Sequence, residues 1–346
     1  MRSSTGKVIG WLVVIGLLAA IQPLYKQIDY ERVVLGYAPP TTVTKVLQYD
    51  APAVTGVIVG AMLGGFREVA ASMMWLKTDS MWHGGKGTSW DALSLMRMTT
   101  LLDPHWLEPW RITAWHCAYN LYVETDDPEI KADLLETGVN VLKEGISWNP
   151  DKYDLYLELG WTYFDKIRDY EEASRWLGAA LAFEHPEFIE RMIGHAWERL
   201  PDIDKALEWY DYCLKRRPND HTAIGATITI RERYLPAWRL MQEGRYDEAL
   251  QHVNQYLAVD PKAIIPLHLK ALILERSGDL ERALQAWQVA ADTQALNAHA
   301  RYKVAELSER LGRPVPPEPS YIYHKRIEAR QKAEEQARAQ TQPQTQ

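Results

Sequence analysis

Hydrophobic positions in the second half of the chain recur at the spacing of helices rather than of strands. Four stretches, 170–186, 202–218, 244–261 and 278–295, each hold an alanine followed four residues later by an apolar or aromatic side chain. Residues four apart lie on the same face of a helix, one turn apart. Three of the stretches end in proline, which cannot continue a helix. The pattern therefore predicts an all-α fold.

The alanines of these stretches repeat at a nearly constant interval. From Ala249 to Ala283 the step is 34 residues, and from Ala173 to Ala206 it is 33. A 34-residue unit of paired helices resembles the tetratricopeptide repeat (TPR), in which small residues let two antiparallel helices approach closely. The resemblance implies stacked helix pairs whose first helices line a concave groove. The following large residues would fill the remaining gaps: Leu177, Tyr210, Val253 and Trp287.

Glycine positions place the first helices of the units. Gly194 stands 12 residues before Ala206, as the repeat requires, whereas Gly160 stands 13 residues before Ala173. One residue is therefore inserted in this earlier unit. A longer insertion lies at 221–236, "HTAIGATITIRERYLP", and we expect its β-branched run to be helical in spite of its strand-like composition.

Weaker copies of the unit surround Ala92 and Gly138, and a polar, helix-like stretch closes the array. Solenoids need such a solvating helix at their ends. We therefore expect a TPR-like α-solenoid over 66–312, with about six helix pairs and a C-terminal capping helix. A proline-rich spacer, a polar helix and a disordered tail are expected over 313–346.

The N-terminus (1–25) has the layout of a membrane anchor. After a short basic start, Val8 to Tyr25 form an uncharged run of 18 residues, near the minimum for crossing hydrocarbon as a helix. A cleaved signal peptide has a similar layout, and a buried soluble helix is a third interpretation. Residues 26–50 include Pro39 and Pro40, which exclude a continuous helix, so we interpret them as a linker.

A glycine-rich apolar stretch, 51–65, leads into the expected solenoid. Its glycines recur every fourth residue and share one helix face: Gly56, Gly60 and Gly64. Such a face suits a second membrane crossing, or contact with the anchor or the bilayer surface. Its shortness, and its direct run into an amphipathic segment, favour a first solenoid helix instead. Residues 63–82 also resemble a stretch of membrane-anchored bacterial TPR proteins of unknown specific function.

The number of crossings decides the compartment. With one crossing and the basic N-terminus inside, the repeats lie outside the cytoplasm; with two, they lie in the cytoplasm. Because the second apolar stretch is short, we expect a single-pass protein of the cell membrane with extracytoplasmic repeats.

The repeat register predicts which side chains face the groove. Those expected to contact a partner are Arg111, Trp115, Tyr119, Asp154, Trp161, Arg191, His195, Arg231, Tyr234, Trp238, His268 and Arg276. The set mixes arginine with aromatic residues, which suits extended peptides carrying aromatic or carboxylate groups. The Lys/Asn pattern by which TPR chaperone adaptors clamp a C-terminal carboxylate is not evident.

No motif for chemistry stands out in the sequence. It holds no phosphate-binding loop, nucleophile elbow or zinc-protease motif, and its two cysteines are isolated. The net charge of −7 comes without a long basic block, so we expect no nucleic-acid binding, and we expect no metal, cofactor or catalytic residue. The expected function is a membrane-tethered scaffold for a protein or peptide partner. The alternative is an integral subunit of a larger membrane complex, held by the glycine face and the Trp-rich N-terminal helices.

Overall fold

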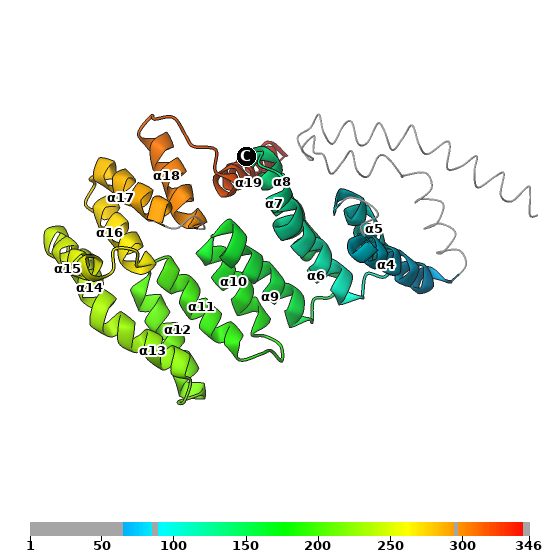
Figure 1. The fold of residues 1–346 in the computed structure, drawn as a ribbon, viewed down its shortest axis with the longest axis horizontal. Coiled ribbons are helices and arrows are strands. Elements are labelled where there is room, and N and C mark those ends of the chain that lie inside the picture. The colour runs from blue at the N-terminus through cyan, green and yellow to red at the C-terminus, as the bar shows by residue number, and fades with distance from the viewer. Residues whose placement is uncertain (1–64, 85–88, 294–296, 342–346) are drawn as a thin grey trace, which may run out of the picture. The chain divides into compact units, whose positions relative to one another are not determined.

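The computed structural model describes residues 65–84, 89–293 and 297–341 (Figure 1). The chain divides into two units, Met1–Ala51 and Pro52–Gln346, and every described residue belongs to the second. All regular structure in these ranges is helical. The expected linker and most of the glycine-rich stretch lie outside them, as does most of the expected disordered tail.

The described helices form six antiparallel-type pairs in chain order, as the repeat register predicts. Each helix contacts the next along the chain, so every pair stacks on the one before it. The pairs are α4 (Arg67–Gly84) with α5 (Ser89–Leu102), α6–η1–α7 (Leu107–Trp115, His116–Leu121, Tyr122–Glu124) with α8 (Pro128–Trp148), α9–η2 (Tyr153–Thr162, Tyr163–Ile167) with α10 (Tyr170–Ala180), α11 (Phe188–Arg199) with α12 (Ile203–Arg216), α13–η3–α14 (His221–Thr229, Ile230–Tyr234, Leu235–Gln242) with α15 (Tyr246–Val259), and α16 (Ile264–Arg276) with α17 (Leu280–Thr293).

Two further helices complete the described chain. α18 (Ala298–Arg310) packs on α17 and confirms the predicted capping helix. An exposed, proline-rich segment then leads to α19 (Pro319–Thr341), the predicted polar helix.

Small residues sit where two helices come closest, as the repeat pattern predicts. The four alanines that define the repeat are fully buried: Ala173, Ala206, Ala249 and Ala283. A Cβ added at Gly194 would lie 2.9 Å from Tyr210, and one added at Gly160 would lie 2.7 Å from Leu177. The interlocking of small and large side chains therefore holds the two helices of each pair together.

Gly160→Ala is expected to lower the free energy of unfolding by about 1–3 kcal/mol, because the new methyl group overpacks the contact between α9 and α10. Leu177 cannot simply turn away, since its backbone nitrogen also lies 3.1 Å from the added atom. Urea unfolding of the purified protein measures the change. The matched control is Gly178→Ala in α10, whose Cβ meets nothing within 4 Å and should leave stability unchanged or slightly higher.

Inserted residues are absorbed inside first helices. The extra residue between Gly160 and Ala173 falls where η2 widens the helix into a π-turn, the usual structural result of a one-residue insertion. The step of 43 residues from Ala206 to Ala249 exceeds the period of 34 by nine, which is the length of α13. The β-branched run is therefore a helical extension, as predicted.

The C-terminal helices also return to early repeats, which the sequence did not predict. Tyr323 of α19 places its hydroxyl 3.1 Å from that of Tyr163 in η2. Arg326 forms ion pairs with Glu129 and Asp133 on α8, and Arg330 pairs with Glu136 one turn further on. Figure 1 shows α19 beside α8, although some 190 residues separate them in sequence.

In the portion of the chain that the structure describes, no helix combines the length and hydrophobicity needed to cross a bilayer. The predicted anchor at 8–25 lies outside that portion.

Candidate protein-binding surface

Exposed aromatic side chains gather on the first helices of the second and third repeats. Trp115 of α6 is 40% exposed and stacks on Tyr119 of η1, with ring centres 5.7 Å apart and planes 15° apart. Trp161 of α9 is 37% exposed and stacks on Phe164 of η2 at 5.6 Å. α6 and α9 contact each other, so these four rings form one surface, which we call the aromatic patch.

Charged groups are interspersed with the aromatic patch. The Arg111 guanidinium lies 3.3 Å from Glu108 and 3.8 Å from Glu158, and so bridges the second and third repeats. The Lys166 ammonium lies 4.1 Å from the centre of the Tyr119 ring, a cation–π contact. Burial lowers the pKa of Lys166 and raises that of Glu158. The patch thus offers flat apolar rings bordered by both signs of charge.

Tyr119 is the most constrained member of the aromatic patch. Its hydroxyl oxygen is buried and makes no hydrogen bond in the structure. Burial, and next the nearby Asp165 carboxylate, raise the pKa of this hydroxyl far above its ordinary value. It therefore stays protonated, and a polar group of a ligand could satisfy it without any change of charge.

A cavity of about 240 Å³ adjoins Trp115 on the side of the first repeat. Its walls are mainly apolar and come from α4, α5 and α6, with His116 and Asn120 of η1 forming a polar edge through a 3.2 Å contact. Its lining residues are Trp75, Thr78, Asp79, Met96, Ile112, Trp115, His116 and Asn120. The cavity extends the apolar surface of the aromatic patch toward α4.

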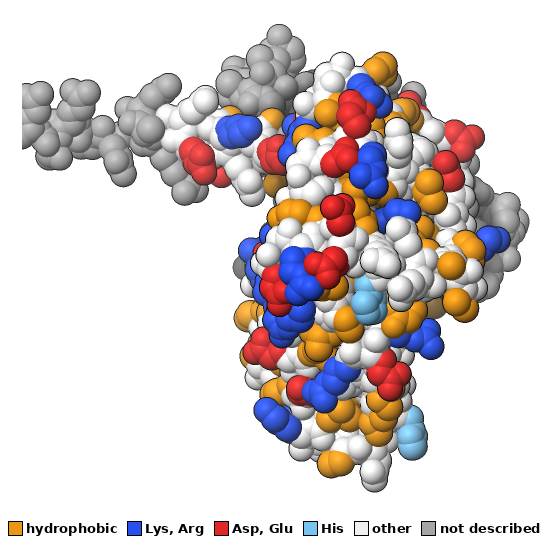
Figure 2. All heavy atoms as spheres, turned by 90° about the vertical axis from the view of Figure 1, so that its left-hand side faces the viewer, with side chains coloured by type: hydrophobic (Ala, Val, Ile, Leu, Met, Phe, Trp, Pro, Cys, Tyr) orange, Lys and Arg blue, Asp and Glu red, His pale blue; other side chains and the backbone are white. Residues whose placement is uncertain are grey.

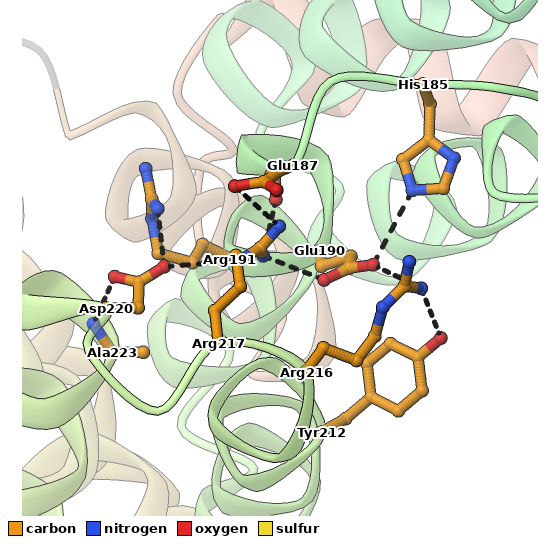
Figure 3. Close-up of polar contacts among 9 residues, drawn as sticks. All are labelled: His185, Glu187, Glu190, Arg191, Tyr212, Arg216, Arg217, Asp220 and Ala223. Carbon is orange, nitrogen blue, oxygen red and sulfur yellow. Dashed lines mark hydrogen bonds and ion pairs between the residues drawn. The ribbon is translucent and has the colours of Figure 1, made fainter.

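Arg191, another predicted groove residue, is held in a network that joins the fourth repeat to the fifth (Figure 3). Its guanidinium lies 2.7 Å from the Asp220 carboxylate, which also accepts a hydrogen bond from the Ala223 backbone at the start of α13. Burial alone would raise the pKa of Asp220, but the hydrogen bonds from Arg191 and Ala223 and the nearby arginine charges bring it below its ordinary value. Arg191 therefore fixes the angle at which α13 leaves α12.

A fully buried carboxylate lies in the same network. Glu190 accepts from Arg217 at 2.8 Å and pairs with Arg216 at 2.8 Å, while His185 lies 3.6 Å away. Figure 3 shows these side chains converging from α11, α12 and the loop before α11. The sequence pattern did not single out this group, because its members sit at positions outside the small-and-large register.

The remaining predicted groove residues divide by exposure. Trp238 is only 5% exposed, and its indole nitrogen donates to Asp204 at 2.8 Å; His268 is fully buried. Both leave little surface for a partner. The others keep part or most of their side chains accessible: Asp154, His195, Arg231, Tyr234 and Arg276. His195 already contacts the Tyr210 hydroxyl at 2.7 Å, and Arg231 pairs with Asp211 at 3.1 Å.

The structure therefore brings together Arg111, Trp115, Tyr119 and Trp161 out of the predicted set, and adds neighbours that the sequence missed. Phe164 and Lys166 were missed because they lie in η2, where the inserted residue rotates the helix relative to a 34-residue template. A signal was available in the 13-residue spacing after Gly160.

The surface over the later repeats has a different character. On the face shown in Figure 2, acidic and basic side chains alternate with apolar ones, with no large area of one sign. Within the described residues no group of three or more His, Cys, Asp or Glu side chains is arranged to hold a metal ion.

Comparisons with known proteins bear on the architecture. No protein-family model matches the sequence, and no curated protein matches it. Among solved structures, a TPR protein of Thermus thermophilus is 19% identical over 52% of this chain and 97% of its own, with a TM-score of 0.34. YrrB, described as a TPR protein with an unusual peptide-binding site, is 19% identical over 59% of this chain and 95% of its own (TM-score 0.29). A tetratricopeptide repeat protein of Parabacteroides merdae is 13% identical over 70% and 87% (TM-score 0.40).

The fold is a TPR-like α-solenoid. The repeat register and the helix contacts described above establish it, and identities this low concern the architecture only. Solenoids of this kind present extended surfaces rather than enclosed reaction sites. The aromatic patch is the part of this TPR-like solenoid best suited to contact another molecule.

Proposed function

We propose that this protein is a scaffold that holds a protein or extended peptide against the first helices of its second and third repeats. The observation that carries the proposal is the pair of exposed, stacked tryptophans, Trp115 and Trp161, on adjacent helices. Tryptophan, tyrosine and arginine dominate binding hot spots, and Arg111 and Tyr119 lie beside this pair. The protein acts by binding rather than by catalysis.

The double variant Trp115→Ala with Trp161→Ala is expected to weaken partner binding by about 30-fold or more, since loss of a hot-spot residue typically costs 2 kcal/mol or more. Affinity capture from solubilised membranes identifies the partner, and titration with that partner measures the loss. Trp148→Ala is the matched control, because Trp148 is 50% exposed but lies at the end of α8, a second helix.

The patch assignment is wrong if the double variant captures its partners as well as the Trp148 control does. Unfolding curves of both variants must match the parent closely for the comparison to count. Arg191 and Trp238 are unsuitable probes, because both make buried or half-buried contacts that hold neighbouring repeats together.

The proposed scaffold is tethered to the cell membrane by the uncharged segment 8–25, with the repeats outside the cytoplasm. Support comes from the length of that segment and its basic N-terminal flank. Tethering raises the effective concentration of the patch near other membrane proteins, which suits a part in assembling an envelope complex. A reporter that is active only outside the cytoplasm, fused after Gly312, tests the orientation.

A further inference from the structure

α4 is apolar on two opposite faces. One face carries Ala71 and Thr78, both buried, and packs on α5. The opposite face is a row of large apolar side chains that are 55–67% exposed, which we call the α4 stripe: Phe66, Val69, Met73 and Leu76. A helix that is apolar all round normally lies inside a fold. The described residues leave one side of this helix uncovered.

The position of the α4 stripe is that of a missing solenoid layer. Each later first helix is covered on its N-terminal side by the second helix of the preceding repeat: α5 contacts α6, α8 contacts α9, and α10 contacts α11. α4 is the first described helix, and within the described residues it has no such neighbour. In a stack where each layer contacts only its neighbours, the chain segment just before α4 is the natural cover.

That segment matches the α4 stripe in chemistry and length. Residues 54–64 carry no charge, and their three glycines would offer a flat helix face on which large side chains can rest: Gly56, Gly60 and Gly64. As a helix, 54–64 would span about 16 Å, and the distance from Phe66 to Leu76 along α4 is about 15 Å. Between them Gly65 has φ +68°, the left-handed conformation that lets a chain reverse direction.

We propose that residues 54–64 pack antiparallel on the α4 stripe, with their glycine face toward Val69 and Met73, and so form the first layer of the solenoid. Glycines repeated every fourth residue then serve close packing within the protein rather than within lipid. A segment used in this way cannot also cross the bilayer. This last step rests on the proposed anchor at 8–25: the chain then crosses once, and its N-terminus and repeats lie on opposite sides.

Cysteine labelling of the full chain in detergent tests the packing. Met73→Cys is expected to react with a maleimide at least tenfold more slowly than Val259→Cys, because Val259, 87% exposed in α15, has no expected cover. The native cysteines contribute little background, since both are fully buried and burial raises the pKa of Cys117 to about 12 and of Cys213 to about 11. Adding Gly60→Leu to Met73→Cys should restore fast labelling, because leucine separates the two helices.

An intrachain disulfide in the Gly56→Cys, Met73→Cys pair, formed at high dilution, would support the proposal directly. Fast labelling of Met73→Cys in detergent overturns it, and labelling that is slow in intact membranes but fast in detergent assigns the α4 stripe to the bilayer. Protection that is lost on dilution assigns it to a second copy, and protection lost on purification to another protein. None of these readouts uses partner capture by the aromatic patch, so the two proposals fail independently.

Discussion

Arg217→Met is expected to lower the free energy of unfolding by about 3–5 kcal/mol, because it leaves the fully buried Glu190 carboxylate without its best-ordered partner. Arg217 is mostly shielded from solvent and donates both to Glu190 and to the backbone oxygen of Glu187. Arg216 also reaches Glu190, but its side chain is 53% exposed and held less firmly. The substitution keeps the length of the side chain and removes its charge.

Urea unfolding at neutral pH measures this effect, and Arg231→Met supplies the comparison. Arg231 pairs with Asp211 at the surface, both side chains being more than 40% exposed, so its loss should cost at most about 1 kcal/mol. Adding Glu190→Gln to Arg217→Met should recover part of the stability, since no buried charge is then left unpaired. Equal losses in Arg217→Met and Arg231→Met would show that the Glu190 network does not hold the fourth repeat together.

Stability is also expected to fall steeply below pH 6.5, because two neutral histidines are buried where late helices meet early repeats. His268 of α16 and His299 of α18 lie with ring centres 5.3 Å apart, and their Nδ1 atoms face the backbone oxygens of Arg199 and Arg168. Burial lowers the pKa of His268 to about 4 and that of His299 well below its ordinary value. The charged groups nearest the pair, Arg168, Arg199 and Lys303, are all positive and oppose protonation further.

The direction follows from proton linkage. The unfolded histidines bind protons near pH 6.5, whereas folded His268 does so only near pH 4, so the unfolded state takes up protons first as the pH falls. The contribution is complete above about pH 7 and declines between 6.5 and 4. His268 alone accounts for about 3 kcal/mol over that interval.

Urea unfolding at pH 7, 6 and 5 measures this dependence. His268→Gln combined with His299→Gln should flatten it, while His221→Gln, at an exposed position, should not. If all three proteins lose stability in parallel, titration of the buried pair is not responsible.

Self-similarity along the chain was enough to predict the helix pairs, the capping helix and the buried alanines, because each depends on contacts within one repeat or between neighbours. Even the weak unit at Gly138 was placed correctly: an added Cβ there would lie 3.1 Å from the Ala114 carbonyl oxygen. Exposure within the groove was predicted less well. Trp238 and His268 stand at groove positions of the register, yet contacts with Asp204 and with the loop after α11 bury them.

What the sequence by itself determined is the local order of this protein: which segments are helices, how they pair, and where small residues must lie. Helix periodicity and close packing act over a few tens of residues, so one chain's pattern records them. The tertiary structure alone decided the contacts of α19 with α8, the His268–His299 pair and the union of Trp115 with Trp161 in one patch. These join side chains across repeats of unequal length, and π-turns and inserted turns shift their directions in ways that a fixed repeat period does not carry.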